Sequence, residues 1–137
     1  MGTPLQEIYD AFFIKSGKDY TDKEDQVYQF FKTGISKSKK TIPTDLTYTV
    51  NPTTYEGTFT NTLEQDEIEL IALNMLLEEK RKRKSELDYL KTHIGTKDFN
   101  KLTDKVTEYK ILNESMKDLR DEIFLLRQEF YSYENTT

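Results

Sequence analysis

The side chains that could do chemistry are one histidine, a short Ser-Gly-Lys run and many carboxylates. His93 would have to serve any histidine-based triad or metal site, but it stands beside Gly95 near an expected helix end, which is the setting of a cap or surface residue. The run Ser16-Gly17-Lys18 lacks the upstream glycine of a phosphate-binding loop. The carboxylates do not follow the spacing of a calcium loop, and the chain has no cysteine. We therefore expect no enzyme activity, no cofactor, no metal and no small-molecule substrate.

A basic run is the strongest electrostatic feature of the sequence, and it consists of Lys80, Arg81, Lys82, Arg83 and Lys84. Such a run can bind an acidic protein surface or nucleic acid. It can equally be a solvated helix face, braced by pairs at four-residue spacing from Glu78 to Lys82 and from Glu79 to Arg83. Because consecutive helical residues point all round the axis, five in a row cannot form one flat stripe for DNA. All three alternatives stay open, and the run is a candidate partner interface.

Bulk composition indicates an extended helical protein rather than a disordered one. Of the 137 residues, 35% are apolar and 33% charged, which is poor in apolar residues for a globular domain. An aromatic content of 12% nevertheless argues against disorder. The net charge of −5 creates no attraction to nucleic acid or anionic membranes. No signal peptide or membrane span is apparent, so we expect a soluble protein made in the cytoplasm.

The most regular pattern lies in the last third of the chain, from Lys101 to Tyr133. Apolar residues alternate there at intervals of three and four, which predicts a long helix that packs lengthwise on another. The residues of this seam are Tyr109, Leu112, Met116, Leu119, Ile123, Leu126, Phe130 and Tyr133. Arg120 and Arg127 flank the seam at one edge, and Glu122 and Glu129 flank it at the other, so the two arginines are further candidates for a partner interface.

A second long helix supplies the simplest partner. It is expected to begin near Thr62, with Gln65 completing a capping box, and to end at His93 and Gly95. The window Ile68–Leu77 is apolar on nearly all sides and is the predicted centre of the core. The next nine residues carry no apolar side chain, so this part of the helix is expected to project into solvent or toward a partner. Because a corner of only about five residues follows, the two long helices should form an antiparallel hairpin.

Two short helices are predicted at the N-terminus. The first covers about Pro4–Lys15 and the second about Asp22–Thr33, because both carry apolar residues at helical spacing. The sequence Thr21-Asp22-Lys23-Glu24 predicts a capping box at the start of the second helix, and Gly34 predicts its end.

An extended arm or β-hairpin is predicted for residues 36–61. The segment opens with a basic patch of Lys37, Lys39 and Lys40. It then alternates apolar residues with threonine, turns at 51–54 and returns. Two strands alone are marginal in water, so the arm must lie on the helices or on another subunit. The candidate partner-interface residues of the arm are Leu46, Tyr48, Val50, Tyr55 and Phe59.

These elements predict a mainly α fold in one domain, residues 1–137. The expected architecture is a helical bundle built on a long antiparallel hairpin of helices, with two short N-terminal helices and the arm as an insertion.

Several segments resemble a group of small virion proteins encoded by tailed bacteriophages. They are residues 4–12, Phe59-Thr60-Asn61, Leu63, residues 67–72, Lys97-Asp98-Phe99-Asn100, and the closing aromatics Phe130, Tyr131 and Tyr133. The resemblance implies a structural protein of the phage neck, which joins the portal to the tail. Such connector proteins form homo-oligomeric rings, commonly of about twelve copies on the portal, contact neck or tail proteins, and meet DNA only by proximity in the channel. A tail or baseplate component, or a helical scaffolding protein absent from the mature particle, would satisfy the same features.

Overall fold

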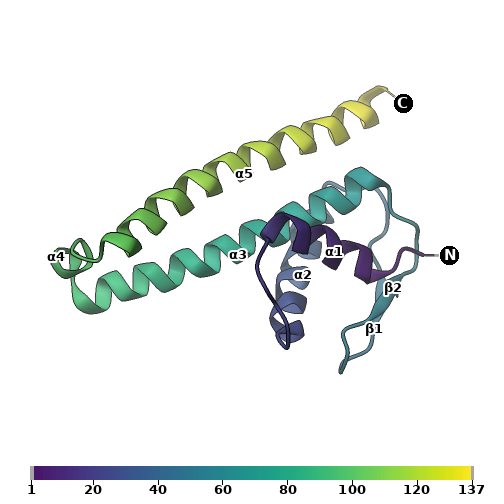
Figure 1. The fold of residues 1–137 in the computed structure, drawn as a ribbon. Helices are drawn as coiled ribbons and strands as arrows, with labels where there is room; N and C mark the ends of the chain where they lie inside the picture. The colour runs from purple at the N-terminus through teal and green to yellow at the C-terminus, as the bar shows by residue number, and fades with distance from the viewer. Residues whose placement is uncertain (1, 137) are drawn as a thin grey trace.

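The computed structural model describes residues 2–136, with side chains up to residue 131, and shows a mainly α fold as predicted. The elements in chain order are α1 (Leu5–Ser16), α2 (Glu24–Ser38), β1 (Tyr48–Val50), β2 (Gly57–Phe59), α3 (Gln65–Ile94), α4 (Thr96–Phe99) and α5 (Thr103–Thr136). Helices α3 and α5 lie side by side, and α4 joins them at one end (Figure 1). The two short helices and the strands gather around the opposite end of α3.

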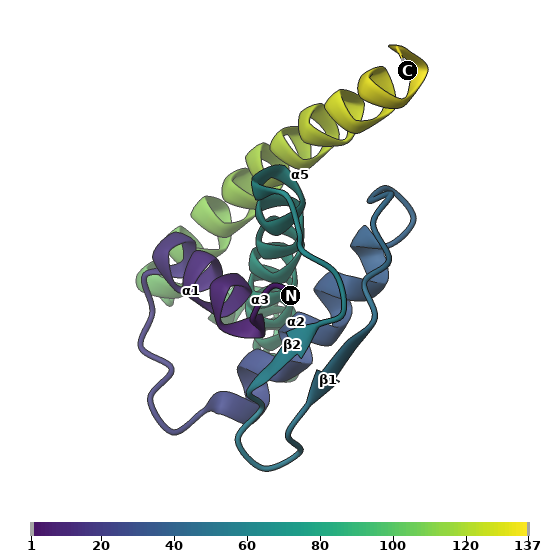
Figure 2. The same cartoon turned by 90° about the vertical axis from the view of Figure 1, so that its right-hand side faces the viewer.

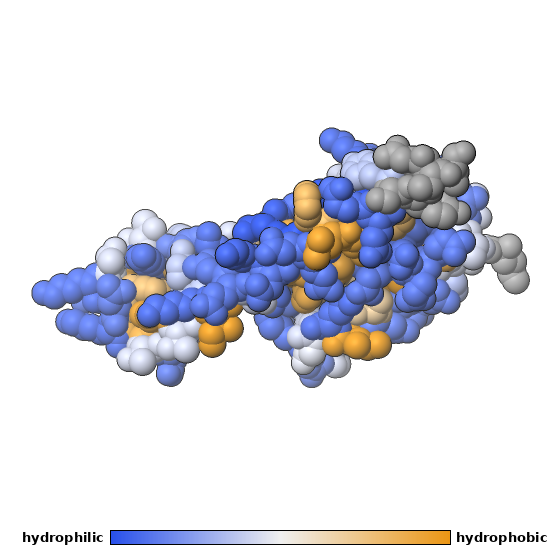
Figure 3. Space-filling view, turned by 90° about the horizontal axis from the view of Figure 1, so that it is seen from above, coloured by the Kyte–Doolittle hydropathy of each residue, from blue (hydrophilic) through white to orange (hydrophobic). Residues whose placement is uncertain are grey.

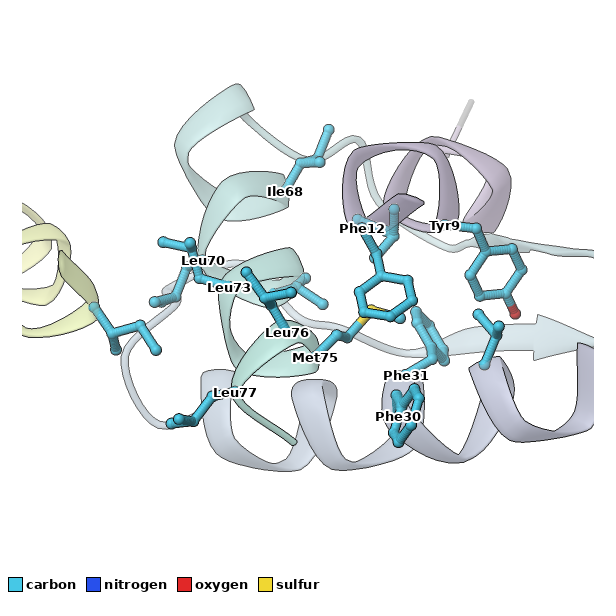
Figure 4. Packing of buried hydrophobic residues seen from close by; sticks show 14 of the residues in the cluster. Tyr9, Phe12, Phe30, Phe31, Ile68, Leu70, Leu73, Met75, Leu76 and Leu77 are labelled. Carbon is cyan, nitrogen blue, oxygen red and sulfur yellow. The ribbon is translucent and has the colours of Figure 1, made fainter. Parts of the chain in front are cut away.

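The N-terminal half of α3 is the centre of the core, as the apolar window Ile68–Leu77 predicted. Leu70, Ile71 and Met75 are fully buried. Figure 4 shows how Phe12 of α1 and Phe31 of α2 meet this part of α3. An apolar side chain stabilises the fold by about 1.5–3 kcal/mol when it is fully buried, so this meeting point of three helices holds the N-terminal elements together.

Helix α1 ends at a glycine that the backbone geometry requires. Gly17 has φ 67° and ψ 6°, the left-handed conformation, and its N–H donates to the Phe13 carbonyl at 2.9 Å. A residue with a side chain is strained in this conformation, whereas glycine is not. The predicted end of this helix is therefore confirmed to within one residue.

Helix α2 differs from the prediction at both ends. It begins at Glu24 with Lys23, not Thr21, at the N-cap position and without a side-chain cap. Thr21 lies in the preceding turn, where its hydroxyl donates to Asp19 at 2.6 Å. Gly34 does not end it, and the helix continues to Ser38. A β-carbon on Gly34 would lie 2.8 Å from Met75 Cγ and 3.1 Å from the carbonyl oxygen of Ile71. Glycine is therefore present at this position because α2 and α3 approach closely there.

The predicted hairpin forms and is attached to the chain's own N-terminal segment. Strands β1 and β2 pair antiparallel, with Tyr48 opposite Phe59 and Thr49 opposite Thr58. The Phe59 N–H donates to the Thr3 carbonyl at 2.8 Å, and the Thr3 N–H donates to the Asn61 carbonyl at 3.2 Å. Figure 2 shows the hairpin beside α2, with its turn at the end of the molecule. The hairpin therefore docks on its own subunit.

Helix α3 begins two to three residues later than the Thr62 cap predicted. Glu64 is its N-cap, and Glu64 and Glu67 form the capping box, with the Glu64 N–H donating to Glu67 Oε1 at 2.8 Å. A carboxylate accepts this type of hydrogen bond as well as a hydroxyl does, and it also interacts favourably with the positive end of the helix dipole.

The terminal seam packs on α3 within the same chain. Leu112, Met116, Leu119 and Ile123 are buried, and Tyr109, Leu126 and Phe130 are partly buried against the core, whereas the side chain of Tyr133 lies outside the described residues. At the α4 end, the Phe99 and Tyr109 rings meet edge to face at 6.2 Å. The two long helices therefore form the predicted antiparallel hairpin.

Candidate functional site

Part of the basic run joins the two long helices. Arg83 pairs with Glu108 of α5 through two hydrogen bonds, of which the Nη2–Oε2 bond is 3.0 Å long. This pairing raises the pKa of Arg83 and lowers that of Glu108. Arg83 also contacts Glu86 at 3.0 Å. Its guanidinium is therefore engaged within the chain.

The predicted pairs at four-residue spacing are wrong. Among the described residues, Glu78 contacts Arg81 at 3.6 Å and Lys37 of α2 at 3.8 Å, instead of Lys82. Arg83 turns to α5 rather than to Glu79. Glu78 therefore has one partner on α3 itself and one on α2, and Arg83 has its main partner on α5, because both neighbouring helices come within reach of this segment.

Lys80 and Lys84 continue the apolar row of α3 that faces α5. They follow Leu73 and Leu77 and precede Leu87 at intervals of three and four, and both are half-buried. Their long aliphatic stems can cover apolar surface while the ammonium groups reach water. Of the five basic residues of the run, Lys82 is exposed and the other four are half-buried, so the run does not form a continuous cationic surface.

Glu79 is a buried carboxylate that sequence reasoning missed. It is 4% exposed and accepts hydrogen bonds from the Tyr20 hydroxyl and, at 2.6 Å, from the Ser16 hydroxyl. Lys18 lies 3.9 Å from its second oxygen. Burial and the bond to Glu79 raise the pKa of Tyr20, so the phenol stays protonated and remains the donor. Glu79 follows Ile71 and Met75 at four-residue steps, which is the signal that could have placed it on the buried face.

The two arginines beside the terminal seam differ from each other. Arg120 is exposed, and so are Glu122 and Glu129. Arg127 is half-buried and donates from Nη2 to the Lys37 carbonyl at 3.4 Å, which connects α5 to the end of α2. Arg120 alone therefore remains freely accessible for the edge pairing that the sequence suggested.

The arm residues predicted for a partner interface are partly used inside the subunit. Phe59 is 1% exposed and Leu46 7% exposed, so both belong to the core. Tyr48, Val50 and Tyr55 are half-buried. The Tyr55 ring stacks on Tyr28 with 4.9 Å between centroids, and its carbonyl accepts from the Tyr9 hydroxyl at 2.9 Å. The most exposed residues of the arm are therefore polar ones near its turn.

A groove of about 850 Å³ opens where α1, the α1–α2 loop, the start of α2 and the hairpin turn meet. We call it the acidic groove. Its aromatic lining consists of Tyr9, Phe13, Tyr20 and Tyr55, and its carboxylates are Asp19, Glu24, Asp25 and Glu56, with Lys18 as the basic lining residue. Hydrogen bonds from Thr21 lower the pKa of Asp19, so this carboxyl is ionised at neutral pH.

The outer face of α5 exposes large apolar side chains. Ile111 is 61% exposed, Phe124 59%, Leu125 64% and Tyr131 47%. Phe124 and Tyr131 are one heptad apart and Ile111 and Leu125 two heptads apart, so each pair lies along one line of the helix. Figure 3 looks down on this side of the molecule and shows apolar surface between charged side chains. We call these four residues the outer α5 face.

A histidine-based site and a metal site have less support from the described residues. His93 is exposed, and its ring stacks on Tyr89 with centroids 5.9 Å apart. In the described part of the chain, no group of three or more potential ligands is placed to hold a metal ion. No helix within residues 2–136 combines the length and apolar character needed to cross a membrane. No protein-family model, curated protein or solved structure matches the chain.

Proposed function

We propose that this chain is a structural subunit of a tailed-bacteriophage particle that assembles as a ring in the neck and bridges portal and tail. No residue has a catalytic role in this proposal. The assembly role is supported chiefly by the outer α5 face. Its four large apolar side chains are exposed to solvent, although the opposite face of the same helix already packs on α3. Placement in the neck is supported by the resemblance of the sequence segments to small virion proteins.

The outer α5 face suits burial against another protein. Each large apolar side chain that moves from water into an interface contributes on the order of 1.5–3 kcal/mol. Aromatic residues are enriched among those that dominate protein interfaces. Phe124 and Leu125 are adjacent and far more exposed than the seam residues Met116 and Ile123. These two side chains are therefore the expected anchors of the contact.

The location is tested on particles purified from the host that produces the chain. Mass spectrometry of the particles should detect the chain in several copies per particle, and antibody labelling should place it at the junction of head and tail. A chain found only in assembly precursors would be a scaffolding protein, and a label at the tail tip would identify a baseplate component. Either result would overturn the neck proposal.

The mechanism is tested by changing the anchors without touching the core. The double variant Phe124→Ser and Leu125→Ser should fold normally but be lost from particles, because it removes apolar contact area from an exposed surface. Ile14→Ser is a matched control, since Ile14 is 84% exposed and lies on α1. Normal incorporation of the double variant would refute the role of the outer α5 face. Deletion of the hairpin is a poor test because Phe59 and Leu46 support the core.

A further inference from the structure

The acidic groove is a surface with a defined chemistry. Its four carboxylates are exposed and outnumber its one basic lining residue, Lys18, and four aromatic side chains line it as well. Aromatic rings and carboxylates together attract lysine and arginine side chains, because both the face of the ring and the carboxylate favour a positive charge. The groove is therefore complementary to a basic segment.

The same chain carries such a segment at the other end of α2. Lys39 and Lys40 follow the last turn of this helix and are exposed, whereas Lys37 is half-buried and lies 3.8 Å from Glu78. The 15 residues of α2 separate the lysines from the groove by about 22 Å at the α-helical rise. Figure 2 shows the two ends of α2, with the hairpin turn and the α1–α2 loop near one and the loop after α2 near the other.

The charges at the ends of α2 also have a local explanation, since acidic residues favour a helix N-terminus and basic residues a C-terminus. Glu24 and Asp25 fit that explanation. Asp19 precedes the helix and Glu56 comes from the hairpin turn, so neither belongs to the first turn of α2, yet both line the groove. Three separate segments thus contribute carboxylates to one groove that is also aromatic, which exceeds what the helix dipole requires.

We propose that the acidic groove of one copy binds Lys39 and Lys40 of a second copy. Because groove and lysines occupy opposite ends of α2, one copy cannot satisfy its own groove, and the contact joins unlike surfaces head to tail. Such contacts build closed rings when the rotation between copies closes, and filaments when it does not. This inference rests on the proposed assembly function and names the contact between neighbouring subunits of the ring.

A charge-exchange experiment on the full chain tests the contact. The first variant, Lys39→Glu with Lys40→Glu, makes both surfaces acidic; the second, Glu24→Lys with Glu56→Lys, makes both basic. Each variant alone should associate at least about tenfold more weakly than the wild type, because like charges then meet. An equimolar mixture should recover association, since each groove finds a loop of opposite charge. Sedimentation velocity and native mass spectrometry measure all four samples at low and high salt.

Controls separate this contact from general charge effects. Lys97→Glu with Lys101→Glu changes the same charge at exposed positions in the corner between the two long helices, away from the groove and the outer α5 face, and should leave association unchanged. Glu24→Gln with Glu56→Gln is a milder variant if the reversal unfolds the chain, and it should weaken association in proportion to the lost charge. Thermal melting confirms that each variant folds.

The outcomes are decisive for each proposal. A wild type that stays monomeric, variants that associate normally, or a mixture that fails to recover would each overturn the head-to-tail contact. None of these results would remove the chain from purified particles, so the structural role would stand on the particle analysis. Absence of the chain from particles would overturn the proposed function even if copies associate through the groove.

Discussion

The close approach of α2 and α3 at Gly34 makes a prediction whose sign depends on two opposing effects. Replacing Gly34 with alanine should favour the helix by about 1 kcal/mol, because glycine in a helix interior is that much less favourable than alanine. The added methyl group would lie 2.8 Å from Met75 Cγ and 3.1 Å from the carbonyl oxygen of Ile71. Such overpacking typically costs about 1–3 kcal/mol. We expect packing to dominate and Gly34→Ala to destabilise the protein by about 1 kcal/mol.

A double-mutant cycle isolates the packing effect. Met75→Ala removes the Cγ that obstructs the new methyl group, and alone it should cost about 2–5 kcal/mol because Met75 is fully buried. In that background, Gly34→Ala should become neutral or stabilising, since the methyl group enters the vacated space. Free energies of unfolding come from urea titrations followed by far-ultraviolet circular dichroism.

An exposed position of the same helix provides the reference for helix propensity. Gln29 lies in α2 and is exposed, so the difference between Gln29→Gly and Gln29→Ala measures the propensity term without tertiary contacts. If Gly34→Ala stabilises the protein by the amount measured at Gln29, the two helices are not in close contact at this point and our explanation of the glycine is incorrect.

Two further predictions concern the long-helix hairpin. Met116→Ala should lower the free energy of unfolding by about 2–4 kcal/mol, because the Met116 side chain is only 2% exposed in the seam. Ile111→Ala should change it by less than about 0.5 kcal/mol, because Ile111 is 61% exposed on the outer α5 face. Equal effects of the two variants in urea titrations would contradict the assigned faces. The second prediction concerns the dependence of stability on pH. Arg83 lowers the pKa of Glu108 in the folded state, so the pair stabilises the protein at pH values above the ordinary glutamate pKa of about 4.3. This stabilisation is lost as the pH falls below that value. Arg83→Gln should therefore be less stable than wild type at neutral pH by up to about 1 kcal/mol for this half-exposed pair, and the two unfolding curves should converge in acid.

The long-helix hairpin was predictable from sequence because its signal is repeated. The seam residues recur over several heptads, and the short corner after Gly95 makes an antiparallel arrangement the simplest one. Each apolar residue in such a pattern adds evidence for the same face. The buried side chains from Leu112 to Ile123 confirm this prediction.

Helix ends were less predictable because single residues decide them. Gly34 was expected to end α2, since glycine is common after helices. In the structure, glycine at this position instead allows α2 to pack closely against α3. The residues that require the close packing are Met75 and Ile71, about forty residues further along the chain. A local rule contains no information about that neighbour. The capping box predicted at Thr21 is absent because the chain still turns there, with the Lys23 N–H donating to the Tyr20 carbonyl at 2.9 Å, and Lys23 is the N-cap residue instead.

The candidate functional surfaces were likewise only partly predictable from the sequence. The periodicity of α5 predicts its buried seam, but Phe124 and Leu125 stand out as an exposed apolar surface only once the opposite face is known to be packed. The acidic groove brings together residues from four segments, and no spacing in the sequence predicts that meeting. Likewise, the sequence placed Glu79 in a stretch expected to project into solvent or toward a partner, whereas its carboxylate is buried and accepts hydrogen bonds from Ser16 and Tyr20.

The central position of α3 has a consequence for the order of events during synthesis. Phe12 and Phe31 leave the ribosome well before Leu77, and at about 5–20 residues per second the delay lasts several seconds. During this time α1, α2 and the hairpin have only one another as apolar partners, for instance through the Tyr9–Phe31 contact at 5.4 Å and the Phe31–Tyr48 contact at 5.2 Å. A nascent chain that stops before Gln65 would therefore expose an aromatic surface to chaperones and to other copies. One that stops after Ile94 would already enclose it, and α5 would then add along a preformed helix.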